Sequence, residues 1–239
     1  MAFENNQTIL RTGARAQTAA IDEGLRAYML KVYNYMASAL ALTGIVAMMT
    51  ASSETMMQTI FNTPLAWVVM LAPLGFMLAL SFGIHKMSMT TVQVLFWSFA
   101  VVMGLSMASI FVVYTGTSIA RVFFITSGMF AGMSLYGYTT KRDLTGFGSF
   151  LMMGLIGLLI AMIVNIFLAS TALHFIISAA GVLIFVGLTA YDTQKIKLIY
   201  GEFDDATTAT KKAIMGALTL YLDFINLFMM MLRLFGERR

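Results

Sequence analysis

The sequence predicts an all-α integral membrane protein in which seven transmembrane helices cross the bilayer. Of its 239 residues, 59% are hydrophobic and only 11% are charged, a balance that soluble domains of this length do not have. The hydrophobic residues also gather into seven runs of about 20 residues, the length that a helix needs to cross a membrane. The predicted spans are residues 28–50, 65–84, 91–113, 119–138, 148–168, 172–191 and 213–234. Because only short loops lie between the spans, residues 28–235 form one membrane domain.

The chain begins with a polar segment, residues 1–27, that carries both acidic and basic side chains. No compact apolar core followed by a small-residue cleavage site is present, which excludes a signal peptide. We therefore expect a polar tail ahead of the first span. The spans that follow contain almost no charge, and Gly128 and Gly132 stand at GxxxG spacing in the fourth of them. Small residues at this spacing allow close approach of a neighbouring helix.

The turns between the spans differ in charge, and this predicts the orientation of the chain. Lys86 follows the second span, and Lys141 and Arg142 follow the fourth. The segment 192–212 after the sixth span contains further lysines, and we expect the helix to continue into it through residues 195–199. The turns after the first, third and fifth spans contain no Lys or Arg. Since positively charged loops stay in the cytoplasm, we expect a cytoplasmic N-terminus.

The C-terminus conflicts with this alternation. Seven crossings put it on the non-cytoplasmic side, yet it carries Arg233, Arg238 and Arg239. Either the last segment crosses against the rule, or it is re-entrant and returns to the cytoplasm. Because earlier loops usually dominate orientation and the run is long enough to span, we expect a full crossing.

Asp223 is the most unusual residue, because it lies near the middle of the last span. A carboxylate there costs about 2.5–3.5 kcal/mol on insertion scales, and no Lys or Arg lies within four residues of it. Asp192, at the end of the sixth span, is the nearest acid expected at membrane depth; its alternative role is an interfacial residue paired with Lys195. Two carboxyls in contact can share a proton, and its loss would make them repel. Asp192 and Asp223 would then form a pH-sensitive switch.

The remaining polar residues suggest supporting roles only. Asn165 and Asn226 are expected to bridge helices by hydrogen bonds, and Tyr221 belongs to the same polar set around the last span. The chain has no cysteine, and it lacks a phosphate-binding loop, a histidine-rich metal motif and a Ser-His-Asp signature. We therefore expect neither an enzyme nor a cofactor. Its positive charge lies in turns and termini, where it orients the protein in the lipid bilayer and does not indicate nucleic acid.

Two stretches carry a resemblance to a known family. Residues 190–196, AYDTQKI, and residues 218–228, LTLYLDFINLF, resemble the Bax inhibitor family, also called the transmembrane Bax inhibitor motif family, and above all its bacterial YccA-like branch. The turn 141–144 fits the family as well. The resemblance implies that the last helix lies central within the other six. It also implies that Asp192 and Asp223 are the family's aspartate pair, held to sense pH and to gate a calcium leak.

The YccA-like branch further implies the bacterial inner membrane and contact with a membrane-anchored AAA protease. One feature departs from the family. Some members carry an acid in the second span that engages the aspartate pair, but residues 65–84 contain none, and Ala72 stands roughly where it would be expected. A cation path here would have fewer fixed negative charges, with calcium a possible ion at Asp192 and Asp223.

Four interpretations remain open from the sequence. The first is a pH-sensitive cation leak, with calcium as the expected ion. The second is an interaction protein in membrane protein quality control that uses the tail 1–27 and the loop 201–212. The third is an intramembrane aspartyl protease, although the glycines that presenilin-like proteases place around their second aspartate are absent beside Asp223. The fourth is a purely structural role, in which the two acids form a hydrogen-bonded pair that only holds two helices together. Such an interhelical hydrogen bond is worth about 0.6–2 kcal/mol, which is less than the cost of inserting either acid, so stability alone does not explain the pair.

Overall fold

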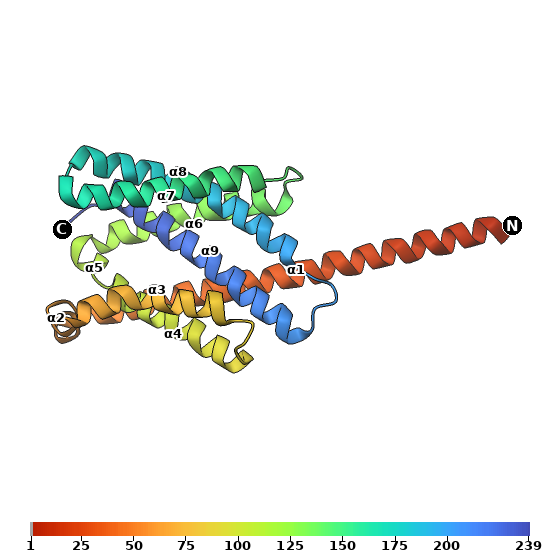
Figure 1. Cartoon of the computed structure of the whole chain (residues 1–239), viewed down its shortest axis with the longest axis horizontal. Coiled ribbons are helices and arrows are strands. Elements are labelled where there is room, and N and C mark those ends of the chain that lie inside the picture. The colour runs from red at the N-terminus through yellow and green to blue at the C-terminus, as the bar shows by residue number, and fades with distance from the viewer. Residues whose placement is uncertain (1) are drawn as a thin grey trace.

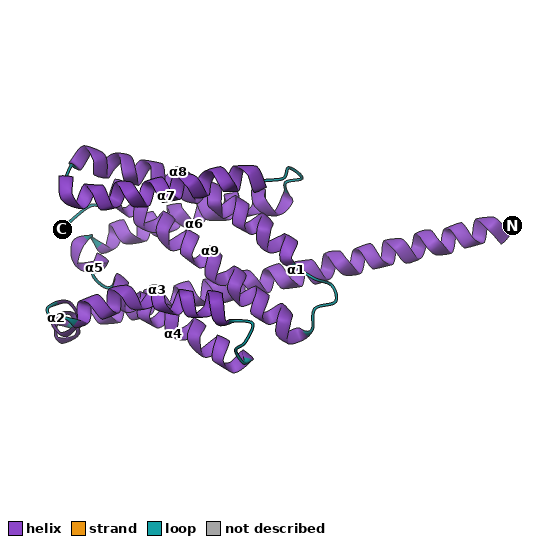
Figure 2. Ribbon diagram, in the orientation of Figure 1, coloured by secondary structure: helices purple, strands orange, loops and turns teal. Residues whose placement is uncertain are grey.

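Long helices dominate the computed structural model, whose backbone is described from Ala2 and whose side chains are described from Asp22 to the C-terminus. Seven of the helices in this described part are long and apolar enough to cross a membrane, as the sequence predicts. Figure 2 shows that short loops join them. The helices are α1 (Ala2–Ala51), α2 (Glu54–Phe61), α3 (Leu65–Gly83), α4 (Met89–Met107), α5 (Ile110–Val113), α6 (Gly116–Thr139), α7 (Thr145–Leu168), α8 (Thr171–Ile199) and α9 (Ala206–Phe235).

The predicted spans match these helices to within a few terminal residues, except that the third, 91–113, is interrupted at residues 108–109 between α4 and α5. The helices α1, α8 and α9 extend well beyond their predicted spans. The helix α1 continues upstream of the predicted span, which starts at residue 28, and projects from the bundle (Figure 1). The expected continuation of the sixth helix through residues 195–199 is confirmed, because α8 ends at Ile199, but α9 begins earlier than predicted, so only residues 200–205 separate the two helices. Asp205 caps the N-terminus of α9, because its side chain accepts hydrogen bonds from the backbone amides of Thr207 and Thr208. The side-chain and backbone bonds from Thr208 hold the pKa of Asp205 below its usual range.

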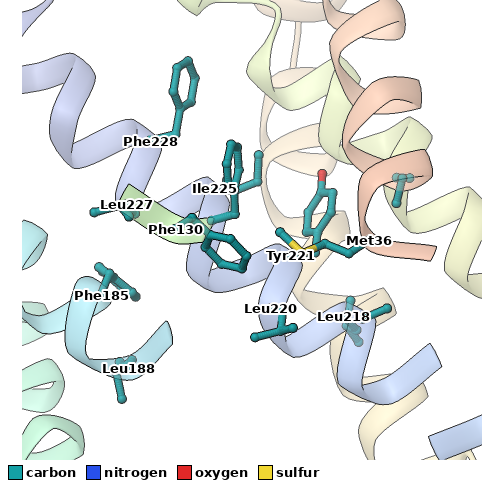
Figure 3. Close-up of a cluster of buried hydrophobic side chains, with 14 of the residues drawn as sticks. Met36, Phe130, Phe185, Leu188, Leu218, Leu220, Tyr221, Ile225, Leu227 and Phe228 are labelled. Carbon is teal, nitrogen blue, oxygen red and sulfur yellow. The ribbon is translucent and has the colours of Figure 1, made fainter. Parts of the chain in front are cut away.

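The last helix is central, as the resemblance implied. Figure 1 shows α9 crossing the middle of the bundle, and it packs against α1, α3, α4, α6 and α8. Figure 3 shows that the apolar side chains of α9 point in several directions, with Leu220 and Leu227 on the side of Phe185 and Leu188 from α8. The helix α7 lies at the periphery, packed against α8. A polar side chain on α9 is therefore enclosed by protein.

The expected packing role of Gly128 and Gly132 is wrong. A Cβ atom added at either glycine would meet nothing within 4 Å. The close approach on α6 is at Gly137, where an added Cβ would collide with the backbone of Ala190 on α8. Gly137 is nine residues from Gly128 and so lies about half a turn around the helix from it. Spacing reveals a small-residue face but not the face that meets a neighbour.

The C-terminus lies at the end of the bundle opposite to the projecting N-terminus (Figure 1). Beyond α9, an isolated antiparallel bridge joins Arg238 to Tyr114, at the end of α5. The Thr115 amide donates to the Glu237 carbonyl over 3.0 Å, and the Arg239 amide donates to the Val113 carbonyl over 3.0 Å. Because α9 is one uninterrupted helix, the last segment crosses the bundle once and is not re-entrant.

The turns at the two ends of the bundle differ in charge. We call the end with the α3–α4, α6–α7 and α8–α9 turns the charged end, because Lys86, Lys141 and Arg142 lie in these turns. The opposite end carries α2, α5, the α7–α8 turn and the C-terminus (Figure 1).

Candidate functional site

Asp223 lies at the centre of the bundle on α9. Its side chain is enclosed, with only 6% of the residue exposed. The helix continues through it without a glycine from Ala217 to Phe235, so the backbone around Asp223 is fully hydrogen-bonded and gives the carboxyl nothing to bind. Any partner of Asp223 has to come from another helix.

The structure brings Asp192 and Asp223 together. Asp192 lies inside α8, is 9% exposed, and has its carboxyl within hydrogen-bonding reach of the Asp223 carboxyl. A hydrogen bond between two carboxyls requires a proton on one of them. The Oδ2 atom of Asp223 is buried and has no partner among the side chains from Asp22 onward. We call Asp192 and Asp223 the acid pair.

The alternative role of Asp192, as the partner of Lys195, is not what the structure shows. The Lys195 ammonium lies over the Tyr191 ring, 5.9 Å from its centroid. It still acts electrostatically on Asp192 from one turn away, but it forms no ion pair with it in the described part of the chain. The carboxyl of Asp223 is therefore the side chain that contacts Asp192 in this site.

A pocket of about 430 Å³ at the charged end reaches Asp192. Its polar and charged lining comes from α1, α3, the α3–α4 turn, α8 and α9: Tyr28, Ser81, His85, Asp192, Lys195, Thr208, Lys211, Lys212 and Thr219. Asp192 lines the pocket and Asp223 does not, so Asp192 separates the pocket from Asp223. Two of the lysines are already engaged: Lys211 donates to the Met87 carbonyl at 2.7 Å, and Lys212 pairs with Asp204 at 2.6 Å.

The turn of α8 that follows Asp192 fixes this helix against its neighbours. Thr193 shares a hydrogen bond of 3.1 Å with Ser134 on α6. Gln194 accepts from the Leu144 amide and donates to the Arg142 carbonyl, both at 2.8 Å. These bonds hold the α6–α7 turn to α8 and so set the position of Asp192. The sequence signal for them is the polar run 192–194 in an otherwise apolar helix, although a role was predicted from it only for Asp192.

Tyr221 supports α9 from one side. Its ring is fully buried and stands edge-on to Phe99, with 5.1 Å between centroids. Its hydroxyl shares a hydrogen bond of 2.7 Å with Thr43 on α1, and Thr43 also donates to the Ala100 carbonyl of α4 at 2.8 Å. One buried hydroxyl pair therefore joins three helices. Thr43 had no predicted role.

The expected bridging by Asn165 and Asn226 is wrong. Asn226 donates to the Leu222 carbonyl in the preceding turn of its own helix at 2.8 Å. Asn165 accepts from the Ser170 amide at 3.0 Å and so stabilises the turn between α7 and α8, far from the acid pair at the opposite end. The physical reason is that an asparagine finds a backbone partner close in sequence more easily than one on another helix.

The acid pair is a small oxygen donor set. Among the described side chains, no three His, Asp or Glu residues lie close enough to hold a metal ion. Calcium takes six to eight oxygen ligands in a resident site. The two carboxylates could contact a passing cation but would leave most of its coordination to backbone oxygens or water.

Comparison with known proteins is consistent over nearly the whole chain. A family described as "Inhibitor of apoptosis-promoting Bax1", Bax1-I, matches residues 25–239. An uncharacterized protein of Rickettsia prowazekii is 51% identical over 224 residues, which cover 94% of this chain and 95% of that protein. The inner membrane protein YbhL of Escherichia coli is 48% identical over 219 residues, which cover 90% of this chain and 94% of YbhL.

Proposed function

Because the chain belongs to the Bax inhibitor family of membrane proteins, we propose that it is a pH-sensitive cation leak gated by the acid pair, with calcium as the ion that passes. The proposal includes an inner-membrane location, as the name of the relative YbhL suggests, and a cytoplasmic N-terminus. The observation that carries it is the contact between the carboxyls of Asp192 and Asp223, enclosed by protein behind a pocket at the charged end.

The gate works through one proton. When the pair shares it, a hydrogen bond joins α8 to α9 and the path past Asp223 is closed. When the proton leaves at higher pH, two like charges about 4 Å apart repel by about 4 kcal/mol at an effective dielectric constant of 20. That repulsion exceeds the roughly 0.6–2 kcal/mol of an interhelical hydrogen bond. The two helices therefore separate, and flux rises with pH.

The same deprotonated pair would attract the ion. Carboxylate oxygens are hard ligands that suit calcium, and conduction needs weak binding so that the ion can leave. The lysines of the pocket oppose entry of a cation, although Lys211 and Lys212 are already bonded to protein oxygens. This arrangement favours a slow leak over a fast conductance.

The test is calcium flux into proteoliposomes across a range of pH. We expect the wild-type flux to increase with pH. Asp223→Asn cannot lose a proton and keeps a hydrogen-bond donor, so its flux should stay low and be about tenfold or more below wild type at high pH. Asp143→Asn is the matched control, since Asp143 lies exposed in the α6–α7 turn. Equal pH profiles for wild type and Asp223→Asn would disprove the gate.

A second candidate is an interaction protein that contacts a membrane-anchored AAA protease. It is supported by Phe203, which is 94% exposed in the α8–α9 loop at the charged end. An aromatic side chain at a polar loop tip is suited to a partner protein. Co-purification from native membranes should recover a protease subunit with the wild type and less of it with Phe203→Ser. Recovery of none with either would remove this candidate.

The intramembrane aspartyl protease has less support from the geometry. A protease of this kind needs an opened substrate backbone beside both acids, and Asp223 is buried in a continuous helix with Leu222 and Phe224 on either side. Paired acids alone are the right chemistry for activating water, but nothing at Asp223 admits a substrate.

A further inference from the structure

A second pocket lies at the opposite end of the bundle, far from the acid pair. It has a volume of about 370 Å³ and lies between the α7–α8 turn and the C-terminal residues. Its polar lining is Tyr114, Asn165, His174, Arg233 and Arg238. No acidic residue lines it, so the pocket is strongly positive. We call it the arginine pocket.

The two arginines are held in place by the backbone. Arg233 lies in the last turn of α9, and the bridge between Tyr114 and Arg238 fixes the C-terminal residues beside α5. Neither guanidinium has a hydrogen-bond acceptor or an ion-pair partner among residues 22–239. Arg121, at the same end, differs because it pairs with Glu237 at 3.5 Å. The arginine pocket is therefore lined by two uncompensated charges on backbone positions that the bridge and α9 define.

His174 adds a third donor. Its Nε2 atom is buried and has no hydrogen-bond partner in the described part of the chain. Because buried polar atoms normally have a partner, this one indicates a missing ligand. His174 is the fourth residue of α8, near the helix end where the backbone dipole favours negative charge. Two guanidiniums and an imidazole around one cavity are the donor set of an oxyanion site.

We propose that the arginine pocket binds the phosphate of an anionic phospholipid headgroup. The pocket lies at the end of the bundle, where the spanning helices α7, α8 and α9 begin or end, and is bordered by Ile166, which is 76% exposed on the peripheral helix α7. An acyl chain can lie along this apolar surface while the phosphate occupies the pocket. This also explains why arginines are kept at an end whose other turns have no Lys or Arg: they bind a ligand instead of orienting the chain.

The test uses the purified full-length chain in a zwitterionic detergent. The midpoint of thermal unfolding is followed while short-chain phosphatidylglycerol, phosphatidylcholine or inorganic phosphate is added. We expect phosphatidylglycerol alone to raise the midpoint. In the double variant Arg233→Gln, Arg238→Gln, the concentration of phosphatidylglycerol that gives half of the shift should rise about tenfold or more, because hydrogen bonds to a charged group are lost.

Arg239→Gln is the matched control, since Arg239 is exposed at the same end but does not line the pocket. It should respond as the wild type does. An unchanged response in the double variant, or no response to phosphatidylglycerol in the wild type, would overturn the proposal. If inorganic phosphate alone raised the unfolding midpoint, the lipid would be ruled out as the ligand and the pocket would be assigned to free phosphate. If the double variant does not fold, Arg238→Lys, which keeps the charge but loses the planar fork, should bind phosphatidylglycerol more weakly than wild type, and equal binding overturns the proposal.

Discussion

Two buried polar residues of α9, Tyr221 and Asp223, differ in how they are satisfied. The Tyr221 hydroxyl has a partner, Thr43, that itself bonds a backbone carbonyl. Asp223 has one oxygen without a described partner, and its other interaction depends on a proton. A fully satisfied buried group stabilises one arrangement, whereas a group that depends on a proton can favour two. Tyr221 therefore holds α9 in place, and in the proposed gate Asp223 is the residue that responds to pH.

Replacing Tyr221 with Phe should cost about 0.5–1.5 kcal/mol of unfolding free energy, the usual net value of one hydrogen bond. The loss is modest because Thr43 keeps its bond to the Ala100 carbonyl. Chemical unfolding in detergent measures it. Tyr136→Phe on α6, whose ring is partly exposed, is the control and should lie within about 0.5 kcal/mol of wild type. Equal effects of the two substitutions would show that the bond to Thr43 contributes nothing.

The acid pair could be predicted from the sequence because a charge in an apolar run is rare and costly. The Thr43–Tyr221 bond could not, since threonine and tyrosine are ordinary in spans and these two are 178 positions apart. The prediction that Asn165 and Asn226 bridge helices is wrong for a related reason. Composition shows that a carboxamide needs a partner, but only the backbone geometry decides that Asn226 finds it one turn away.

At the scale of helices, α8 joins the parts of the bundle, because it packs against α6, α7 and α9. Its approach to α6 depends on Gly137, where the backbone of Ala190 occupies the place of a side chain. Ala190 is two residues before Asp192, so the distance between α6 and α8 also affects the position of the acid pair.

Gly137→Ala should destabilise the protein by about 1–3 kcal/mol, the usual cost of overpacking. Gly128→Ala in the same helix is the matched control. Its Cβ enters open space, and alanine has the better helix propensity, so the control should be neutral or slightly stabilising. The thermal unfolding midpoints of the two variants give the comparison. If both variants unfold at the same temperature, α6 and α8 do not depend on this contact.

Helix number and order could be predicted from hydropathy, but the start of α9 at Ala206 could not. Hydropathy falls where charges begin after Asp192, and α8 continues to Ile199 as expected, with Lys197 donating to the Tyr138 carbonyl of α6 at 2.8 Å. A long lysine side chain can stay on a helix and still reach a polar partner. The central place of α9 came from the family resemblance, because seven similar runs do not reveal which one the others surround.

For the whole molecule, the structure places the α8–α9 loop and the C-terminus at opposite ends of the bundle (Figure 1). The absence of cysteine allows a direct check with single cysteines. Phe203→Cys should react with a membrane-impermeant maleimide in inverted vesicles, and Arg239→Cys should react in intact spheroplasts. Asn62→Cys, beside α2, should behave like Arg239→Cys. Labelling of all three from one side would contradict the single crossing by α9.

The bridge between the C-terminal residues and α5 has a mechanical consequence. It fixes one end of α9 at residues 236–239, while the other end leads into the short loop 200–205. At 1.5 Å per residue, Asp223 lies about 20 Å from this pivot and Ala206 about 45 Å from it. If α9 turns as a rigid lever about this pivot, a displacement of about 1 Å between the two carboxyls becomes about 2 Å at Ala206, near the bonds of Lys211 and Lys212. A proton inside the bundle would in this way be reported at the surface, where Phe203 is exposed.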